Sequence, residues 1–220
     1  MTQIMTPSAD RKLMTDGQID KAVEAYRAML RKHRNELGAE ATQQVLGSDN
    51  YLNEQVGVFR RHIEAVSNFI VRHVKVDRSR TPQQAIKATG RVLYLNDSVV
   101  ETMPKEEGEE ADVCFFEPEP SEYTRPGFIN DDDLQKALER RGLVHDPIAV
   151  AAANEEDPAF ADKHPNGTQW KDANGKWCYA TFRRWRDERR VDVFRGGNGW
   201  GDGWLFAGVR KSPLQSEPLV

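Results

Sequence analysis

The most informative part of the chain is the stretch Arg195-Gly-Gly-Asn-Gly-Trp-Gly-Asp-Gly-Trp-Leu-Phe-Ala-Gly-Val-Arg-Lys211. Six of these seventeen residues are glycine, yet three are large aromatics. A loop that cradles phosphate leads into a helix, whereas these glycines lead into the apolar run 204–209. The run predicts a strand inside a sheet over 203–210, and the pattern argues against a nucleotide-binding loop.

The residues before this stretch are typical of antiparallel β-structure. Asp172-Ala-Asn-Gly175 ends in Asn-Gly, a turn signal, and lies between the β-rich segments 168–171 and 176–185. A second, charged turn at 186–189 leads into the segment 190–195. The sequence therefore predicts a small antiparallel sheet that includes the C-terminal strand.

Alternate residues of segment 190–195 differ in character. Val191 and Val193 suit a core, so Arg190, Asp192 and Phe194 are expected to share the opposite, solvent-facing side. That second set combines a cation, an anion and an aromatic ring with no common structural role. The alternating glycines that follow are also unusual, because each costs roughly 0.5–1 kcal/mol of extra chain entropy.

The residues Arg195-Gly-Gly-Asn-Gly-Trp200, followed by Gly208-Val209-Arg210, resemble the "RGG-x-W … GFR" ending of C-type-lectin-fold domains of the formylglycine-generating-enzyme type. The same ending closes the variable proteins of diversity-generating retroelements. The resemblance covers about the last fifty residues and extends plausibly back to Asp112, with Val209 in place of the usual phenylalanine. Catalysis in that superfamily relies on cysteines, and Cys178 has no nearby partner.

The resemblance to variable proteins implies a non-catalytic ligand-binding surface. Diversification in that family substitutes adenines, typically in asparagine codons, and such codons can yield Arg, Asp, Phe, Gly, Asn and Leu but not Trp. Trp200, Trp204 and Phe206 are therefore expected to be scaffold, with Trp177 and Trp185 adding rigidity. The expected variable residues are Arg183, Arg186, Arg190, Asp192, Phe194, Gly196, Gly197, Asn198, Gly199, Gly201, Gly203 and Leu205.

Two other interpretations of the same segment stay open. Five arginines flank one turn, namely Arg183, Arg184, Arg186, Arg189 and Arg190, and with exposed aromatics they would suit a nucleic-acid-binding accessory protein. Edge strands also carry charge simply to block aggregation, and the glycines would then form a plain turn. The expected partner under the favoured hypothesis is a protein or other macromolecule of unknown identity.

The first third of the chain has a helical pattern. Ile19, Val23, Tyr26 and Leu30 predict one helix beginning near Asp16. A longer 4-3 pattern, Leu52, Val56, Phe59, Ile63, Val66, Ile70 and His73, predicts a helix over 51–74. It would pack within a small bundle, burying Ile63 and Val66, or join copies of the chain in a homo-oligomer.

The middle of the chain predicts short alternating elements. Thr81-Pro82 marks a helix start, 91–95 and 112–117 are β-rich, and Asn130 and Asp146 cap two further helices. The fold class is therefore α+β. We expect a helical N-terminal region at 1–80, a C-type-lectin-like domain at 81–212 and a flexible tail at 213–220.

Composition narrows the function classes. The 220 residues carry a net charge of -4, and two distant cysteines argue against a disulfide scaffold. No window of about 18 apolar residues predicts membrane insertion, and the N-terminus has no signal-peptide pattern, so a cytoplasmic protein is expected. No catalytic set or metal-ligand cluster stands out, so we expect neither an enzyme nor a bound cofactor or metal.

Overall fold

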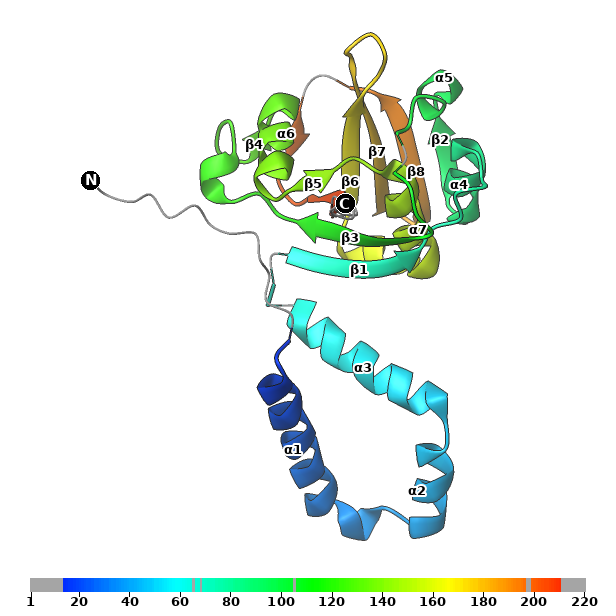
Figure 1. Ribbon diagram of the computed structural model, residues 1–220, viewed down its shortest axis with the longest axis vertical. Helices are drawn as coiled ribbons and strands as arrows, with labels where there is room; N and C mark the ends of the chain where they lie inside the picture. Colours follow the sequence, from blue (N-terminus) through cyan, green and yellow to red (C-terminus); the bar gives the residue numbers. More distant parts are fainter. Residues whose placement is uncertain (1–13, 65, 68, 105, 197–198, 211–220) are drawn as a thin grey trace, which may run out of the picture. The chain divides into compact units, whose positions relative to one another are not determined.

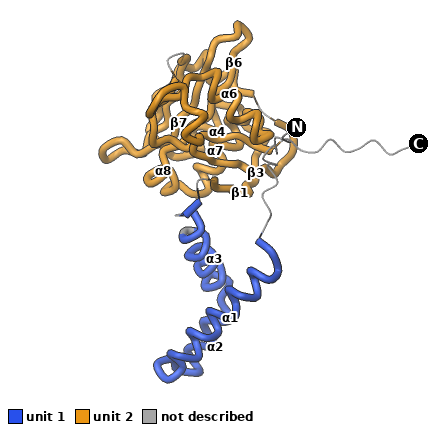
Figure 2. Tube along the Cα trace, turned by 90° about the vertical axis from the view of Figure 1, so that its left-hand side faces the viewer, with its two compact units in different colours: residues 1–67 blue, residues 68–220 orange. Residues whose placement is uncertain are grey.

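The computed structural model describes residues 14–64, 66–67, 69–104, 106–196 and 199–210. The chain divides into two compact units, residues 1–67 and 68–220 (Figure 2). The expected flexible tail at 213–220 lies outside the described residues. The boundary falls at residue 67 rather than at the expected residue 80, because the segment after it is a strand of the second unit.

The first unit is helical, as its sequence pattern predicts. Thr15 accepts a hydrogen bond from the backbone of Gln18 and begins the first helix with a capping box. The elements are α1 (Asp16–Lys32), the 3-10 turn η1 (Arg34–Glu36), α2 (Ala39–Leu46) and α3 (Asp49–Glu64). None of the residues of this unit whose burial the structure describes is buried, so the described helices do not enclose a core.

The long helix expected over 51–74 is only partly confirmed. It ends at Glu64, and Phe69–Lys75 forms strand β1 instead. Ile70, Arg72 and Val74 alternate inward on that strand, which is the period of a strand rather than of a helix. Ile63 is 47% exposed and Val66 86% exposed, so their expected burial within the chain is wrong.

The second unit mixes helices with a large, mostly antiparallel sheet (Figure 1). Its helices are α4 (Pro82–Ala88), α5 (Asp97–Val100), the 3-10 turn η2 (Pro120–Glu122), α6 (Asp131–Arg140), α7 (Pro147–Glu156) and α8 (Phe160–Lys163). Its strands are β1, β2 (Val92–Leu95), β3 (Glu110–Phe116), β4 (Phe128–Ile129), β5 (Leu143–Val144), β6 (Asn166–Lys171), β7 (Trp177–Trp185), β8 (Glu188–Arg195), β9 (Trp200–Gly201) and β10 (Leu205–Arg210).

Within the described residues the main sheet has eight strands in the order β1-β3-β10-β6-β7-β8-β2, with β5 added beside β10. The β10–β6 and β8–β2 pairs are parallel and the other pairs are antiparallel. The sheet is therefore larger than the small one expected, since β1, β2 and β3 all join it. The predicted strand at the C-terminus is confirmed, and it lies between β3 and β6.

Two hydrophobic cores lie on opposite sides of this sheet. Val113 and Phe115 of β3 belong to the first core with α7, while Cys114 and Phe116 belong to the second core with α6. The β3–β10 region is thus covered on both faces. On β8, Val191 and Val193 also face the first core, but no residue of β8 belongs to the second. Apart from Tyr179 of β7, which packs against the second core, the fold therefore leaves one face of β7, β8 and β2 outside the two cores.

None of the helices in the described part of the chain has the length and apolar character that a membrane crossing requires.

Candidate functional site

The uncovered sheet face is built from strands that run side by side, β7, β8 and β2 (Figure 1). Residues paired across neighbouring strands share a face. On β8, Arg190 pairs with Arg183, Asp192 with Thr181, and Phe194 with Tyr179. The predicted alternation is confirmed, because Val191 and Val193 lie fully buried on the opposite side.

A pocket of about 510 Å³ opens on this face, and we call it the sheet-face pocket. Seven of the twelve residues expected to bind ligand contribute to it. Its lining residues are Asp131, Tyr179, Thr181, Arg183, Arg190, Asp192, Phe194, Arg195, Gly196, Gly199, Trp200, Gly201 and Trp204. The structure therefore gathers most of the sequence-predicted site into one concave surface.

The carboxylate of Asp192 is the electrostatic centre of the pocket. Arg190 donates from Nε to Oδ1 at 3.0 Å and also contacts this carboxylate through Nη2. Arg183 Nε lies 3.4 Å from Oδ2 on the other side. Asp192 is only 5% exposed, so the expectation that it faces solvent is wrong. Two guanidinium groups lie close to the carboxylate and shield it from water.

Aromatic rings hold the two guanidinium groups in place. The Arg190 guanidinium lies 4.0 Å from the ring centre of Tyr94. The Arg183 guanidinium lies 4.8 Å from the ring centre of Trp185 and 5.8 Å from that of Trp204. Cations are attracted to aromatic faces at these distances. The pocket therefore presents arginines in fixed positions rather than as mobile surface charges.

Trp200 forms a buried wall of the pocket. Its indole Nε1 donates to Asp131 Oδ1 at 3.1 Å and lies 3.2 Å from Gln169 Oε1. Gln169 in turn donates from Nε2 to the Asp131 carbonyl at 2.7 Å. Burial raises the pKa of Asp131, although hydrogen bonds from Trp200 and the Gly199 backbone oppose this shift. The predicted scaffold role of Trp200 agrees with this network.

The pocket glycines differ in how much change they can accept. At Gly199 φ is +76°, and a Cβ would lie 2.5 Å from the Ile129 carbonyl oxygen. At Gly196 a Cβ would lie 2.7 Å from a Tyr179 ring carbon. At Gly201 no atom lies within 4 Å of the added Cβ. The expectation that all these positions are tolerant therefore holds for Gly201 and fails for Gly199.

The other expected binding residues lie elsewhere or are not described. Arg186 is exposed at the β7–β8 turn, and Gly203 is exposed before β10, both away from the pocket lining. Leu205 is half-buried against the first core and is not among the residues that line the pocket. Gly197 and Asn198 lie outside the described residues.

The scaffold role expected of Trp185 is also wrong in part. It is 49% exposed and packs against Arg183 rather than in a core. The fully buried tryptophan is instead Trp170, whose indole donates to Thr102 at 3.1 Å. Trp185 therefore belongs to the rim of the open face.

Several residues of the site are absent from the sequence-based prediction. Tyr179 and Thr181 follow from the same period-two rule, because they alternate with Arg183 along β7. Asp131 comes from the start of α6, and Tyr94 from β2, which pairs in parallel with β8. Their position depends on long-range pairing that no local pattern signals.

The arginine cluster that motivated the nucleic-acid interpretation is largely paired with carboxylates. Arg189 donates to Asp162 from both Nε and Nη2, the latter at 2.7 Å, and Arg184 lies 3.7 Å from the same carboxylate. Hydrogen bonding to Arg189 lowers the pKa of Asp162. With Asp192 serving Arg183 and Arg190, two carboxylates serve four of the five arginines, and part of the positive charge of the cluster remains uncompensated by them.

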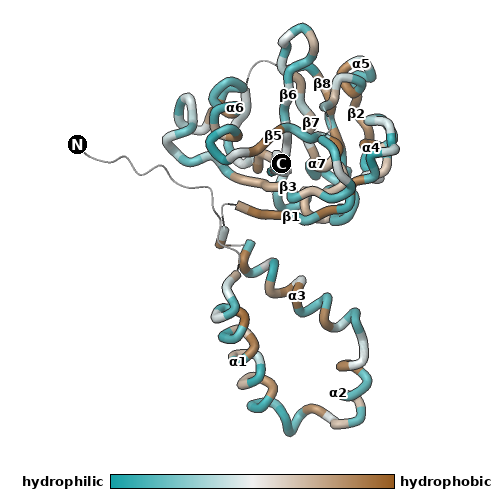
Figure 3. The backbone as a smooth tube through the Cα atoms, viewed as in Figure 1, coloured by the Kyte–Doolittle hydropathy of each residue, from teal (hydrophilic) through white to brown (hydrophobic). Residues whose placement is uncertain are grey.

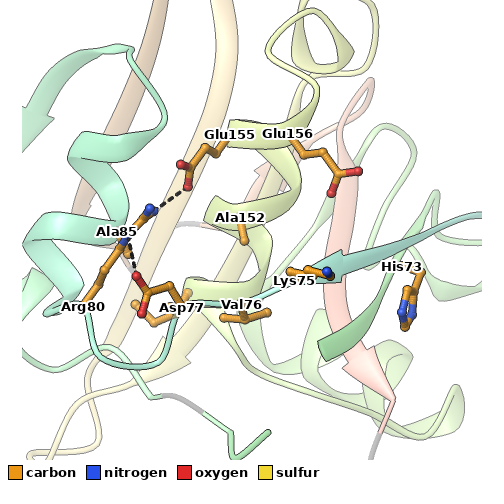
Figure 4. Close-up of a pocket in the computed structure, with 10 residues that line it drawn as sticks. His73, Lys75, Val76, Asp77, Arg80, Ala85, Ala152, Glu155 and Glu156 are labelled. Carbon is orange, nitrogen blue, oxygen red and sulfur yellow. Dashed lines mark hydrogen bonds and ion pairs between the residues drawn. The ribbon is translucent and has the colours of Figure 1, made fainter. Parts of the chain in front are cut away.

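A second pocket of about 630 Å³ lies beside α4, α7 and β1 (Figure 4). Arg80 points across it and bonds to Glu155 at 2.7 Å and to Asp77 at 3.2 Å. Two acidic groups thus already neutralise this cation. The sheet-face pocket is the stronger candidate site, because it combines a buried charge cluster with aromatic walls.

His145 is a structural histidine. Its Nε2 lies 2.7 Å from Gln135 Oε1, and its buried Nδ1 has no hydrogen-bond partner among the described residues. Burial lowers its pKa to about 4. Protonation would place an unpartnered charge in the interior, so the neutral form is favoured in the fold.

This depressed pKa predicts a pH dependence of stability. Between pH 6.5 and 4 the unfolded chain binds a proton at His145 that the folded chain does not, so the free energy of unfolding falls as the pH falls. The full effect is about 3 kcal/mol. In urea unfolding at several pH values, the free energy of unfolding of His145→Gln should fall less steeply toward acid pH than that of the parent. Parallel curves for the two proteins would contradict the assignment.

Comparison of the chain with protein-family models, curated proteins and solved structures gives no match.

Proposed function

We propose that this protein binds a macromolecular ligand at the sheet-face pocket without catalysing a reaction, and that the pocket is a diversified surface like that of retroelement variable proteins. The observation that carries the proposal is the clustering of seven expected binding residues in one pocket. Six of them lie within 190–201, and the pairing of β7 with β8 adds Arg183 from a neighbouring strand. Arg183, Arg190, Phe194 and Gly201 are the expected variable positions, whereas Asp192 and Gly199 belong to the framework of the pocket.

The order of elements supports a C-type-lectin-like fold for the second unit. A strand (β3), two helices (α6 and α7) and then the strands β6 to β10 follow one another along the chain, with the short elements η2, β4, β5 and α8 between them. That is the order by which the resemblance of the C-terminal motif extends back to Asp112. The additional strands β1 and β2 and helices α4 and α5 precede or flank this arrangement and enlarge the sheet.

The charge distribution favours ligand binding over nucleic-acid binding. Phosphate recognition depends on cations that can release counterions. Here Arg183 and Arg190 are committed to Asp192, and Arg184 and Arg189 to Asp162. The pocket offers aromatic walls and oriented charge instead, which are the features of protein-binding surfaces.

A paired-library experiment tests the proposal. One library varies Phe194 and Gly201 freely and Arg183 and Arg190 between Arg and Lys, so that the buried Asp192 keeps its cations. A matched library varies four exposed residues outside the pocket in the same way, namely Lys87, Glu101, Glu139 and Lys163. Both are selected for binding to the same set of unrelated folded proteins. The pocket library is expected to yield binders with micromolar or lower Kd whose tryptophan emission matches that of the parent.

Two outcomes would overturn this proposal. Equal numbers of binders from the two libraries would leave the pocket with no special role. A change of tryptophan emission throughout the pocket library would show that the face is structural. The neighbouring DNA gives an independent check. A near-repeat of the 3′ coding end that differs mainly at adenines is expected beside a reverse-transcriptase gene.

A further inference from the structure

The first unit exposes an unusual amount of apolar surface. Figure 3 shows hydrophobic residues recurring along α1 and α3 between hydrophilic ones. In the described part of this unit, fifteen large hydrophobic side chains are exposed to solvent. A segment with no buried core does not gain enough free energy from burial to hold its helices unaided.

The exposed residues form two matching stripes. On α1 they are Ile19, Val23, Tyr26 and Leu30, and on α3 they are Leu52, Val56, Phe59 and Ile63. Both stripes repeat at spacings of 4, 3 and 4, and both span the same number of residues. This is the spacing of helices that pack in coiled coils and four-helix bundles.

On each helix, acidic residues predominate in the first half and basic residues in the second half. The first half of α1 carries Asp16, Asp20 and Glu24 against Lys21, while the second half carries Arg27, Arg31 and Lys32. On α3, Asp49 and Glu54 lie in the first half, and the second half carries Arg60 and Arg61 against Glu64. Two copies of such a helix in antiparallel orientation place acidic halves against basic halves, whereas a parallel pair places like charges together.

We propose that the first unit is a dimerisation module, in which α1 and α3 of two copies of this chain pack their stripes together as a four-helix bundle. The inference is independent of ligand binding at the sheet-face pocket. The two copies together supply four apolar stripes of equal length, which is the number that the interior of a four-helix bundle needs. In a dimer with two-fold symmetry, each helix can pair with the same helix of the other copy in antiparallel orientation.

The charge of the unit favours a second copy over other occupants. Residues 14–67 contain eight acidic and seven basic residues, so the unit is close to neutral. A nucleic-acid or anionic-membrane partner would require a basic face. A nearly neutral unit whose charges are separated within each helix is complementary to itself.

Sedimentation of the full chain tests the proposal. The parent is expected to have twice the 25.0 kDa mass of one chain. Val23→Asp and Val56→Asp each place a carboxylate in the bundle interior and should weaken dimerisation at least about 30-fold, the effect of losing a central contact. Ala28→Asp is the matched control, because it lies about 180° around α1 from the stripe and should leave the mass unchanged.

Tryptophan emission separates loss of dimerisation from general unfolding. All five tryptophans lie in the second unit, so their emission should be the same in the dimer and in the Val23→Asp and Val56→Asp monomers. A parent of single-chain mass at every concentration would overturn the proposal. Equal weakening by Ala28→Asp and Val23→Asp, or a dimer that persists in both stripe variants, would also overturn it.

Discussion

Gly199→Ala is expected to lower the free energy of unfolding by about 2–5 kcal/mol. The backbone at this position has φ +76°, which costs a residue with a Cβ about 1–2 kcal/mol. The new methyl would also lie 2.5 Å from the Ile129 carbonyl oxygen and 2.6 Å from the Phe128 ring. Neither neighbour can withdraw easily, because Ile129 pairs with Trp200 in the β4–β9 sheet. Overpacking of this kind adds about 1–3 kcal/mol.

Gly201→Ala provides the control for this prediction. The two glycines flank Trp200, but no atom lies within 4 Å of a Cβ built at Gly201. Its alanine variant should change stability by no more than about 0.5 kcal/mol. Chemical denaturation of the two variants checks the difference. If both cost the same, Gly199 is as replaceable as the sequence resemblance implies.

The second large effect is expected from Asp192→Asn. The amide keeps the shape of the side chain but removes the charge that holds Arg183 and Arg190. Removing one partner of a buried ion pair lowers the free energy of unfolding by about 3–5 kcal/mol, because the other charge is left buried without a partner. The two arginines retain some access to water, so we expect a loss of about 2–4 kcal/mol.

Arg186→Ser is the comparison for Asp192→Asn, because Arg186 is exposed at the tip of the β7–β8 turn. This variant should change the free energy of unfolding by no more than about 0.5 kcal/mol and therefore shift the melting temperature only slightly. A thermal-melt series on both variants provides the measurement. An Asp192→Asn protein as stable as the parent would show that the carboxylate belongs to a tolerant surface, as its alternation in sequence suggests.

These two positions show where a sequence pattern stops being informative. The period-two rule places Arg190, Asp192 and Phe194 on one side of a strand, and the structure confirms that arrangement. The rule does not report what covers a face. Asp192 is buried because Arg183 from the neighbouring strand closes over it, and that contact depends on the β7–β8 register.

The helical pattern after residue 64 illustrates the same limit. Val66, Ile70 and His73 continue the 4-3 spacing, yet residues 69–75 pair along their whole length with Glu110–Phe116. Ile70 and Val74 satisfy both a helical and a strand period. The antiparallel partner decides between them, since a paired strand buries both residues and satisfies its backbone.

The sequence by itself determined the local elements of this protein. Thr81, Asn130 and Asp146 cap the helices that they were expected to begin, and the Asn-Gly turn joins β6 to β7. Caps and turns act within four residues, so their chemistry can be read directly. Only the tertiary structure decided that β1, β2 and β3 join the sheet, that Asp192 is enclosed and that a side chain at Gly199 would meet Phe128 and Ile129. Each of these depends on segments far apart in the chain, whose contacts arise from packing and register rather than from local preference.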